Sequence, residues 1–209
     1  MVTTPRVTLP SSALTVSTNY GFEMAGNYAF YDKNADISLK PEFYKYILQN
    51  AKKIVIWDPH FMENEDGKLF EAVTQQDVKI NILSVCQRTH LGSQEEKEVL
   101  TLRDNIKDAL RKAGITRFSG YVNAFKSNKE SWNGSRIYPC HDRFWIIDDK
   151  VAYIVGASMN NMLDSEWTYG IMKIEKNTNY DIFKIITDKH DDMIRKISRI
   201  NCWKGRLQP

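Results

Sequence analysis

The sequence predicts an α/β fold, in which a largely parallel mixed β-sheet is flanked by helices on both faces. Short, wholly apolar runs are typical of strands that are buried on both faces, and Ile54–Trp57 is the clearest of them. Segments with helical periodicity separate these runs. The resulting β-α-β-α-β order favours parallel strands that are joined by helical crossovers.

The first part of the chain carries weak signals. Residues 1–12 are rich in Thr, Pro and Ser, which predicts a flexible arm. Residues 13–31 mix β-branched and aromatic residues with glycines, and one or two strands are expected there. A helix is expected from Pro41, because proline suits the first helical position and the apolar residues after it recur on one face.

Stronger elements alternate in the next part of the chain. We expect, in order, a strand at 54–57, a short helix around 68–74, a strand at 78–85, a long helix at 93–114 and a strand at 115–122. The long helix has the clearest limits. Ser93 and Glu96 form a capping-box pattern at its start, and Gly114 suits its end.

The last part of the chain continues the pattern. Apolar runs at 143–147 and 151–155 predict two strands, and residues 167–174 predict another. Residues 181–200 predict an amphipathic helix with one apolar stripe, which consists of Ile182, Ile185, Ile186, Met193, Ile197 and Ile200. We expect this stripe to face the core or a dimer interface.

The composition is that of a globular protein. The chain has 209 residues with a net charge of +3, which permits an anionic partner without requiring one. Three cysteines without a CxxC pair fit a reducing cytosol, and no apolar run suits a signal peptide or a membrane span. We therefore expect a cytoplasmic protein with one domain at residues 13–209. No metal or other cofactor is expected, because the histidines and cysteines lack zinc-ligand spacing.

The residues that suggest chemistry gather in one stretch, CHDRFWIIDDKVAYIVGASMNN. His141, Asp142 and Arg143 precede one apolar strand, and a polar cluster with Ser158 and Asn160 follows the next. If both strands lie in one sheet, their ends bring imidazole, guanidinium, hydroxyl and amide groups together. This set suits a phosphate, because arginine offers a planar fork of donors and histidine can attack or carry a proton.

This stretch resembles the motif of the phospholipase D superfamily, H-x-K-x4-D followed by a Gly-Ser-x-Asn segment. The first part corresponds to His141, Arg143 and Asp148, and the second to Gly156, Ser158 and Asn160. The resemblance implies the phospholipase D-like fold and covalent catalysis. One histidine attacks phosphorus, a second protonates the leaving group, Lys and Asn hold the phosphoryl oxygens, and Asp steadies a histidine. It thus implies catalytic roles for His141, Arg143 and Asp148, and phosphate binding by Arg143, Ser158 and Asn160.

The stretch departs from the family pattern in three ways. Arg143 replaces lysine, which keeps the charge but changes its geometry. Ala157 splits the Gly-Ser pair, and the spacing after Asp148 is long, so Asp149 could be the counterpart of the family's aspartate. Only one motif is present, whereas the mechanism needs two histidines. Single-motif members pair two chains about a two-fold axis, so a homodimer is expected.

Each motif residue also has a structural interpretation. Arg143 could be an exposed strand charge, and Ser158 and Asn160 could be turn or cap residues. Asp148 could belong to a hairpin turn, and we expect it to serve both the turn and the site.

Other polar residues follow the first two parallel strands. Asp58 and His60 come after one, and Arg88 and His90 after the next. Ligand sites in such sheets lie beyond the carboxyl ends of the strands, so these residues are further candidates. His190, in the last helix, is expected to be solvated.

Two functions stay open. The first is a metal-independent, homodimeric nuclease of the phospholipase D type. The second is a non-catalytic module that binds a nucleic-acid backbone or a phosphoinositide headgroup. The His-Asp-Arg variant is similar to that of prokaryotic phospholipase-D-like proteins linked with mobile elements and defence. It is also similar to the lipid-binding C-terminal module of MIT-domain proteins. A membrane lipid is the less favoured partner, because the last helix has a mixed acidic and basic face. The sequence does not distinguish DNA from RNA.

Overall fold

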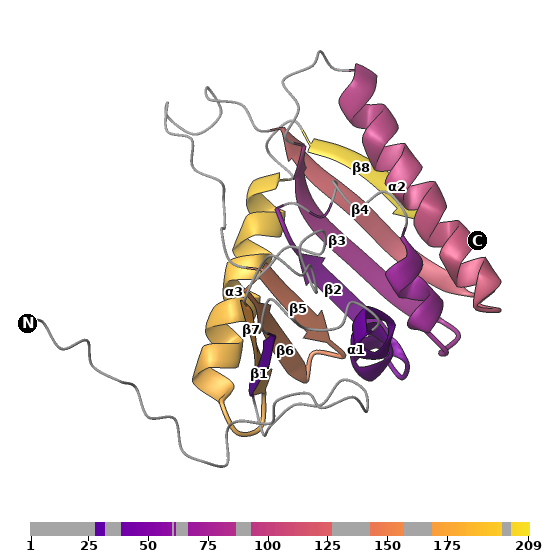
Figure 1. Ribbon diagram of the computed structural model, residues 1–209. Coiled ribbons are helices and arrows are strands. Elements are labelled where there is room, and N and C mark those ends of the chain that lie inside the picture. Colours follow the sequence, from indigo (N-terminus) through magenta and orange to yellow (C-terminus); the bar gives the residue numbers. More distant parts are fainter. Residues whose placement is uncertain are drawn as a thin grey trace, which may run out of the picture.

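The computed structural model describes residues 28–31, 39–59, 61, 67–86, 93–126, 143–156, 169–197 and 202–209. Its elements are β1 (Tyr28–Tyr31), α1 (Leu39–Leu48), β2 (Lys53–Trp57), the 3₁₀ helix η2 (Lys68–Ala72), β3 (Val78–Cys86), α2 (Ser93–Lys112), β4 (Phe118–Lys126), β5 (Arg143–Ile147), β6 (Val151–Val155), β7 (Tyr169–Glu175), α3 (Tyr180–Ile197) and β8 (Cys202–Leu207) (Figure 1).

The strands form one sheet in the order β1-β7-β6-β5-β2-β3-β4-β8. The α/β class with a mixed sheet is confirmed, but the parallel part is smaller than expected. Only β2–β3 and β3–β4 are parallel among the strand pairs that the structure describes. The reason is visible at β5 and β6, which only the turn at residues 148–150 separates. So short a connection joins antiparallel strands, because a parallel pair needs a long crossover.

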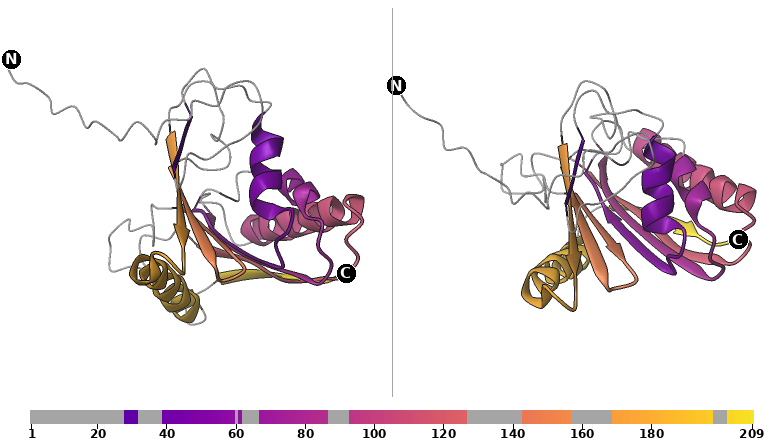
Figure 2. Two further views of the ribbon diagram at one scale, coloured as in Figure 1. Left: turned by 90° about the horizontal axis from the view of Figure 1, so that it is seen from below. Right: turned by 60° about the horizontal axis from the view of Figure 1, so that its bottom comes forward.

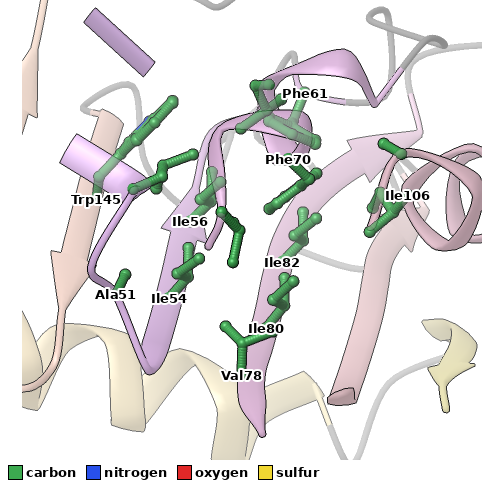
Figure 3. Close-up of a cluster of buried hydrophobic side chains, with 14 of the residues drawn as sticks. Ala51, Ile54, Ile56, Phe61, Phe70, Val78, Ile80, Ile82, Ile106 and Trp145 are labelled. Atoms are coloured by element: carbon green, nitrogen blue, oxygen red, sulfur yellow. The ribbon is translucent and has the colours of Figure 1, made fainter. Parts of the chain in front are cut away.

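Helices lie on both faces of the sheet, as expected (Figure 2). On one face, α1, η2 and α2 cover a large core cluster, which includes the side chains labelled in Figure 3: Ala51, Ile54, Ile56, Phe61, Phe70, Val78, Ile80, Ile82, Ile106 and Trp145. On the other face, α3 covers a smaller cluster: Val55, Ile146, Ala152, Ile174, Phe183 and Ile186. The alternation of side chains along each strand thus decides which residues belong to which face.

Close packing of β3 against β4 depends on Gly120. This residue has φ +141° and lies opposite Ile80 in the strand register. A Cβ at this position would lie 1.7 Å from the backbone oxygen of Ile80. A larger residue here would therefore force the two parallel strands apart.

Candidate functional site

Arg143, the first residue of β5, lies beside the carboxyl end of β2. The two strands are antiparallel, with Phe144 opposite Trp57, so the residue before Phe144 comes next to Asp58. Nε of Arg143 lies 3.6 Å from Oδ1 of Asp58. Nη1 donates a long hydrogen bond of 3.5 Å to the carbonyl oxygen of Gly156, which follows β6. Ends of three strands thus meet at one guanidinium group.

The Arg143–Asp58 pair is largely withdrawn from solvent. The Asp58 side chain is 1% exposed and that of Arg143 is 19% exposed. A buried carboxylate needs a partner, since leaving one uncompensated is costly. The pair does not use the whole guanidinium, however. Nε is buried without a hydrogen bond, and no described residue accepts one from Nη2. Arg143 therefore keeps donors that a ligand could use.

Neighbouring contacts hold the carboxyl ends of β2 and β3 together. The backbone amide of Asp58 donates to the carbonyl oxygen of Leu83 at 3.1 Å. The hydroxyl of Ser84, a buried residue, donates to the carbonyl oxygen of Pro59 at 3.3 Å. Sequence reasoning did not select Ser84. The sequence shows Ser84 only as a hydroxyl residue near the end of an otherwise apolar strand. This pattern is common and does not by itself indicate a functional site.

Asp148 lies at the opposite end of β5. Its Oδ1 accepts hydrogen bonds from the backbone amides of Lys52 and Lys53, at 2.8 and 2.7 Å. Asp149 forms an ion pair of 2.7 Å with the Lys53 ammonium. Both aspartates have positive φ, 54° and 55°, as tight turns require. The hairpin interpretation of this turn is confirmed.

The structure therefore does not bring Asp148 or Asp149 to Arg143. Five residues of extended strand span about 16 Å, at roughly 3.3 Å per residue. We expected Asp148 to serve both the turn and the site, but in this geometry it serves the turn alone. Its carboxylate is engaged by two backbone amides and lies too far away for direct contact with a ligand at Arg143.

Several predicted site residues lie outside the described residues. They are His141, Ser158 and Asn160 of the motif, together with His60, Arg88 and His90. Of the candidates that follow the parallel strands, Asp58 is described, and it contacts Arg143.

His190 is buried rather than solvated. It is 9% exposed, and its ring packs edge-on against Trp57 with centroids 6.3 Å apart. Its Nδ1 lies 3.2 Å from Oδ1 of Asp191. Burial lowers the pKa of His190, although the nearby Asp191 carboxylate opposes the shift. The ring is therefore part of the packing between α3 and β2.

A cleft of about 660 Å³ opens between α3 and the sheet, on the face opposite the main core. Side chains from β3 and β4 form its floor, among them Lys79, Asn81, Tyr121 and Asn123. Sequence reasoning gave no sign of this cleft, because it depends on the register of three strands.

The described part of the chain was also searched for metal-binding clusters and for membrane-spanning helices. No group of three or more His, Cys, Asp or Glu side chains in it could hold a metal ion. None of its helices is long and apolar enough to cross a membrane.

Comparisons with known proteins give only remote likenesses. No protein-family model matches the chain, and no curated protein does. NucT from Helicobacter pylori has a TM-score of 0.47 and 14% identity, over 78% of this chain and 93% of that one. Nuc from Salmonella typhimurium, a phospholipase D family member, has a TM-score of 0.39 and 11% identity, over 78% and 92%. TrmBL2, an archaeal chromatin protein with a novel mode of DNA binding, has a TM-score of 0.39 and 12% identity, over 81% of this chain and 52% of that one. TM-scores below 0.5 do not assign a function to this chain.

Proposed function

We propose that this protein is a phospholipase D-like phosphodiesterase that acts on a nucleic-acid backbone, with Arg143 as the group that holds the phosphate. The observation that carries the proposal is the partly buried guanidinium of Arg143, which has unused donors at the meeting point of three strand ends. A phosphodiester presents two non-bridging oxygens that share one negative charge, in a geometry that such a fork fits. The carboxyl ends of parallel strands, here β2 and β3, are also where ligands bind in α/β sheets.

In this proposal His141, two residues before Arg143 in the sequence, attacks phosphorus. A phosphorus–nitrogen bond forms as the bond to the leaving oxygen breaks, and that oxygen takes a proton from a second histidine. Water then hydrolyses the phosphohistidine. Ser158 and Asn160 supply neutral donors to the phosphoryl oxygens. The second histidine is His141 of another copy, so the active form is a homodimer, and the chemistry needs no metal.

Asp58 and Asp148 are positioning residues in this scheme. Asp58 contacts the Nε edge of the guanidinium, which fixes the direction of the remaining donors. Arginine suits this arrangement better than lysine, because a planar group can face a carboxylate on one edge and a phosphate on another. Asp148 fixes the turn after β5, and with it the register that places Arg143 beside Asp58.

The same ion pair favours a second function, a non-catalytic module that binds a nucleic-acid backbone or a phosphoinositide headgroup. Asp58 compensates the charge of Arg143, and the arginine side chain is only 19% exposed. A compensated guanidinium can hold a phosphate, but it stabilises less of the negative charge that develops in a transition state.

One experiment separates the two functions. The protein is incubated with labelled single- and double-stranded DNA and RNA in EDTA. Cleavage by the wild type that is lost in His141→Ala, with an unchanged melting temperature, supports the enzyme. Retention of the strand without cleavage supports the binding module. Cleavage that disappears in EDTA and returns with magnesium would contradict the covalent histidine mechanism.

A second experiment tests the assembly. Light scattering should give about twice the chain mass of 24.3 kDa at micromolar concentration. A strict monomer that still cleaves would exclude the symmetric two-histidine mechanism.

A further inference from the structure

The face of the sheet opposite the Arg143 site carries a polar patch across β3, β4 and β8. Ile80, Val122 and Leu207 point into the main core cluster. Their neighbours in each strand therefore point to the opposite face, because side chains alternate along a strand. We call this patch the open face, and it consists of Lys79, Asn81, Tyr121, Asn123, Lys204 and Arg206.

The strand register makes the open face continuous. Tyr121 of β4 lies between Asn81 of β3 and Arg206 of β8, and Asn123 lies opposite Lys204. Neighbouring strands are only about 4.8 Å apart, so these side chains form one surface rather than isolated groups.

Described helices cover the open face only in part, at the cleft that α3 forms with it. The helix on that side, α3, packs on β6 and β7, whereas α1, η2 and α2 lie on the other side of the sheet. Figure 2 shows α3 next to the β5–β7 half of the sheet, with the β3–β4–β8 half extending to its side. The cleft of about 660 Å³ lies between α3 and this second half, with Tyr121 in its lining. Its volume is within the range of pockets that hold small organic groups.

The charges of the open face suit a polyanion. Lys79, Lys204 and Arg206 are exposed, and none pairs with an acidic side chain in the described part of the chain. By contrast, Lys53 and Lys184 in the cleft wall are paired with Asp149 and Asp188. The acidic groups of the cleft thus lie on α3 and in the β5–β6 turn, whereas the unpaired positive charges of the open face lie on β3 and β8.

The aromatic and amide groups suit a base. Tyr121 is 44% exposed at the centre of the patch, and an exposed aromatic ring beside cations is the usual stacking platform for unpaired bases. Asn123 lines the cleft, and Oδ1 of Asn81 is buried there without a hydrogen bond. Stacking on Tyr121 requires a base that has left its helix, which points to a single strand.

We infer that the open face binds single-stranded nucleic acid, with a base stacked on Tyr121 and phosphates on Lys79, Lys204 and Arg206. This surface and the Arg143 site lie on opposite faces of the sheet, so the inference does not depend on the proposed function. The site holds one phosphodiester, whereas the open face would hold several nucleotides of a strand.

The inference is tested by fluorescence anisotropy with a labelled 12-nucleotide single-stranded DNA, its RNA equivalent and the matching duplex. Tyr121→Ala should weaken single-strand binding about 5- to 100-fold, as expected for the loss of one stacked base. Tyr121→Phe keeps the ring and should bind within about twofold of the wild type. The matched control is Tyr46→Ala, which removes a tyrosine that is 40% exposed on α1, on the other side of the sheet.

The charges are tested separately by salt dependence. The triple variant Lys79→Ala, Lys204→Ala, Arg206→Ala should lower the slope of log K against log salt by about 2, at roughly 0.7 per phosphate contact. Lys107→Ala on α2 should leave the slope unchanged. A bromouracil-containing strand that cross-links to the wild type should mark a peptide of β4, which provides a measurement without any substitution.

Three results would overturn the inference. The first is wild-type affinity in both Tyr121→Ala and the triple variant. The second is binding of anionic phospholipid vesicles through these residues without binding of the oligonucleotide. The third is binding of the single-stranded oligonucleotide that is lost in Arg143→Gln but unchanged in Tyr121→Ala. This third result would leave the proposed function intact. The reverse, loss in Tyr121→Ala alone, supports the open face and counts against Arg143.

Discussion

The two ends of β5 differ in how far the fold itself uses their polar groups. At one end, the Asp148 carboxylate accepts two backbone amides at 2.8 and 2.7 Å. At the other end, the contacts of Arg143 with described residues are a 3.6 Å ion pair and a 3.5 Å hydrogen bond. One end is fully engaged in holding the turn, and the other keeps donors for a ligand. Arg143 and Asp148 are close in sequence but therefore lie at two separate places in the structure.

The largest effect is expected from removing Arg143. Arg143→Ala breaks the ion pair with the buried Asp58 carboxylate, which should lower the free energy of unfolding by about 3–5 kcal/mol. The double variant Arg143→Ala, Asp58→Asn should recover much of this loss, since no charge stays buried. Urea denaturation of the wild type, both single variants and the double variant measures the coupling. A loss below about 0.5 kcal/mol would identify Arg143 as a solvated strand residue.

A smaller loss is expected at the other end of the strand. Asp148→Ala removes the acceptor of two backbone amides and places alanine at positive φ, which should cost about 2–3 kcal/mol. Asp148→Asn keeps an acceptor oxygen and tolerates this φ, so about 1 kcal/mol is expected. Both folded variants should retain phosphodiester binding. Loss of binding in folded Asp148→Asn would show that the two ends of β5 are not functionally separate.

Arg143→Lys should have a moderate effect on binding and a small one on stability. An ammonium group can compensate Asp58 but cannot also present a second edge to a phosphate. Affinity for a dinucleoside monophosphate, measured by NMR titration, should fall up to about tenfold, or roughly 1.4 kcal/mol. An unchanged or higher affinity would mean that the planar fork has no role, and that lysine and arginine are equivalent here.

The smallest effect concerns His190, which packs against Trp57 next to Asp58. Burial lowers the pKa of His190, so the unfolded chain binds this proton at a higher pH than the folded protein does. The corresponding stability is fully present above the unfolded value of about 6.5, and it is lost as the pH falls toward the lower folded value. Stability at pH 7.5 and 5.5 should therefore differ less in His190→Gln than in the wild type. An equal difference in both proteins would exclude this contribution.

Elements that are buried on both faces could be predicted from the sequence. The runs at 54–57, 144–147 and 151–155 are wholly apolar, and all three lie in strands of the structure. By contrast, β8 was missed, because Lys204 and Arg206 interrupt its apolar residues and only its pairing with β4 makes it a strand. The share of parallel strands was overestimated, because the short turn at Asp148 makes β5 and β6 an antiparallel hairpin.

The predicted apolar stripe of the last helix is correct only in part, because it included the buried Ile186 and Met193 but also Ile182 and Ile185. Ile182 and Ile185 are 49% and 59% exposed, whereas Phe183, Ile186 and Met193 are buried. His190 falls seven residues after Phe183, which is two helical turns along the same face. Its burial could thus have been predicted by starting the stripe at Phe183. The sequence could predict Asp58 as a candidate, because ligand sites lie beyond the carboxyl ends of parallel strands. It could not predict the contact between Asp58 and Arg143, because that contact depends on the register of β5 against β2.

The most direct test of the central claim compares Asp58→Asn with the double variant Asp58→Asn, Arg143→Gln. Neither protein leaves a buried carboxylate unpaired at this position, so a difference between them reports on the guanidinium and not on folding. Binding of a dinucleoside monophosphate, which carries one phosphodiester, is measured at fixed salt by NMR titration. We expect the double variant to bind about 10- to 100-fold more weakly, because it loses a charge-assisted hydrogen bond worth roughly 1.5–3 kcal/mol. Equal affinity in the two proteins would contradict the assignment of Arg143 as the group that holds the phosphate.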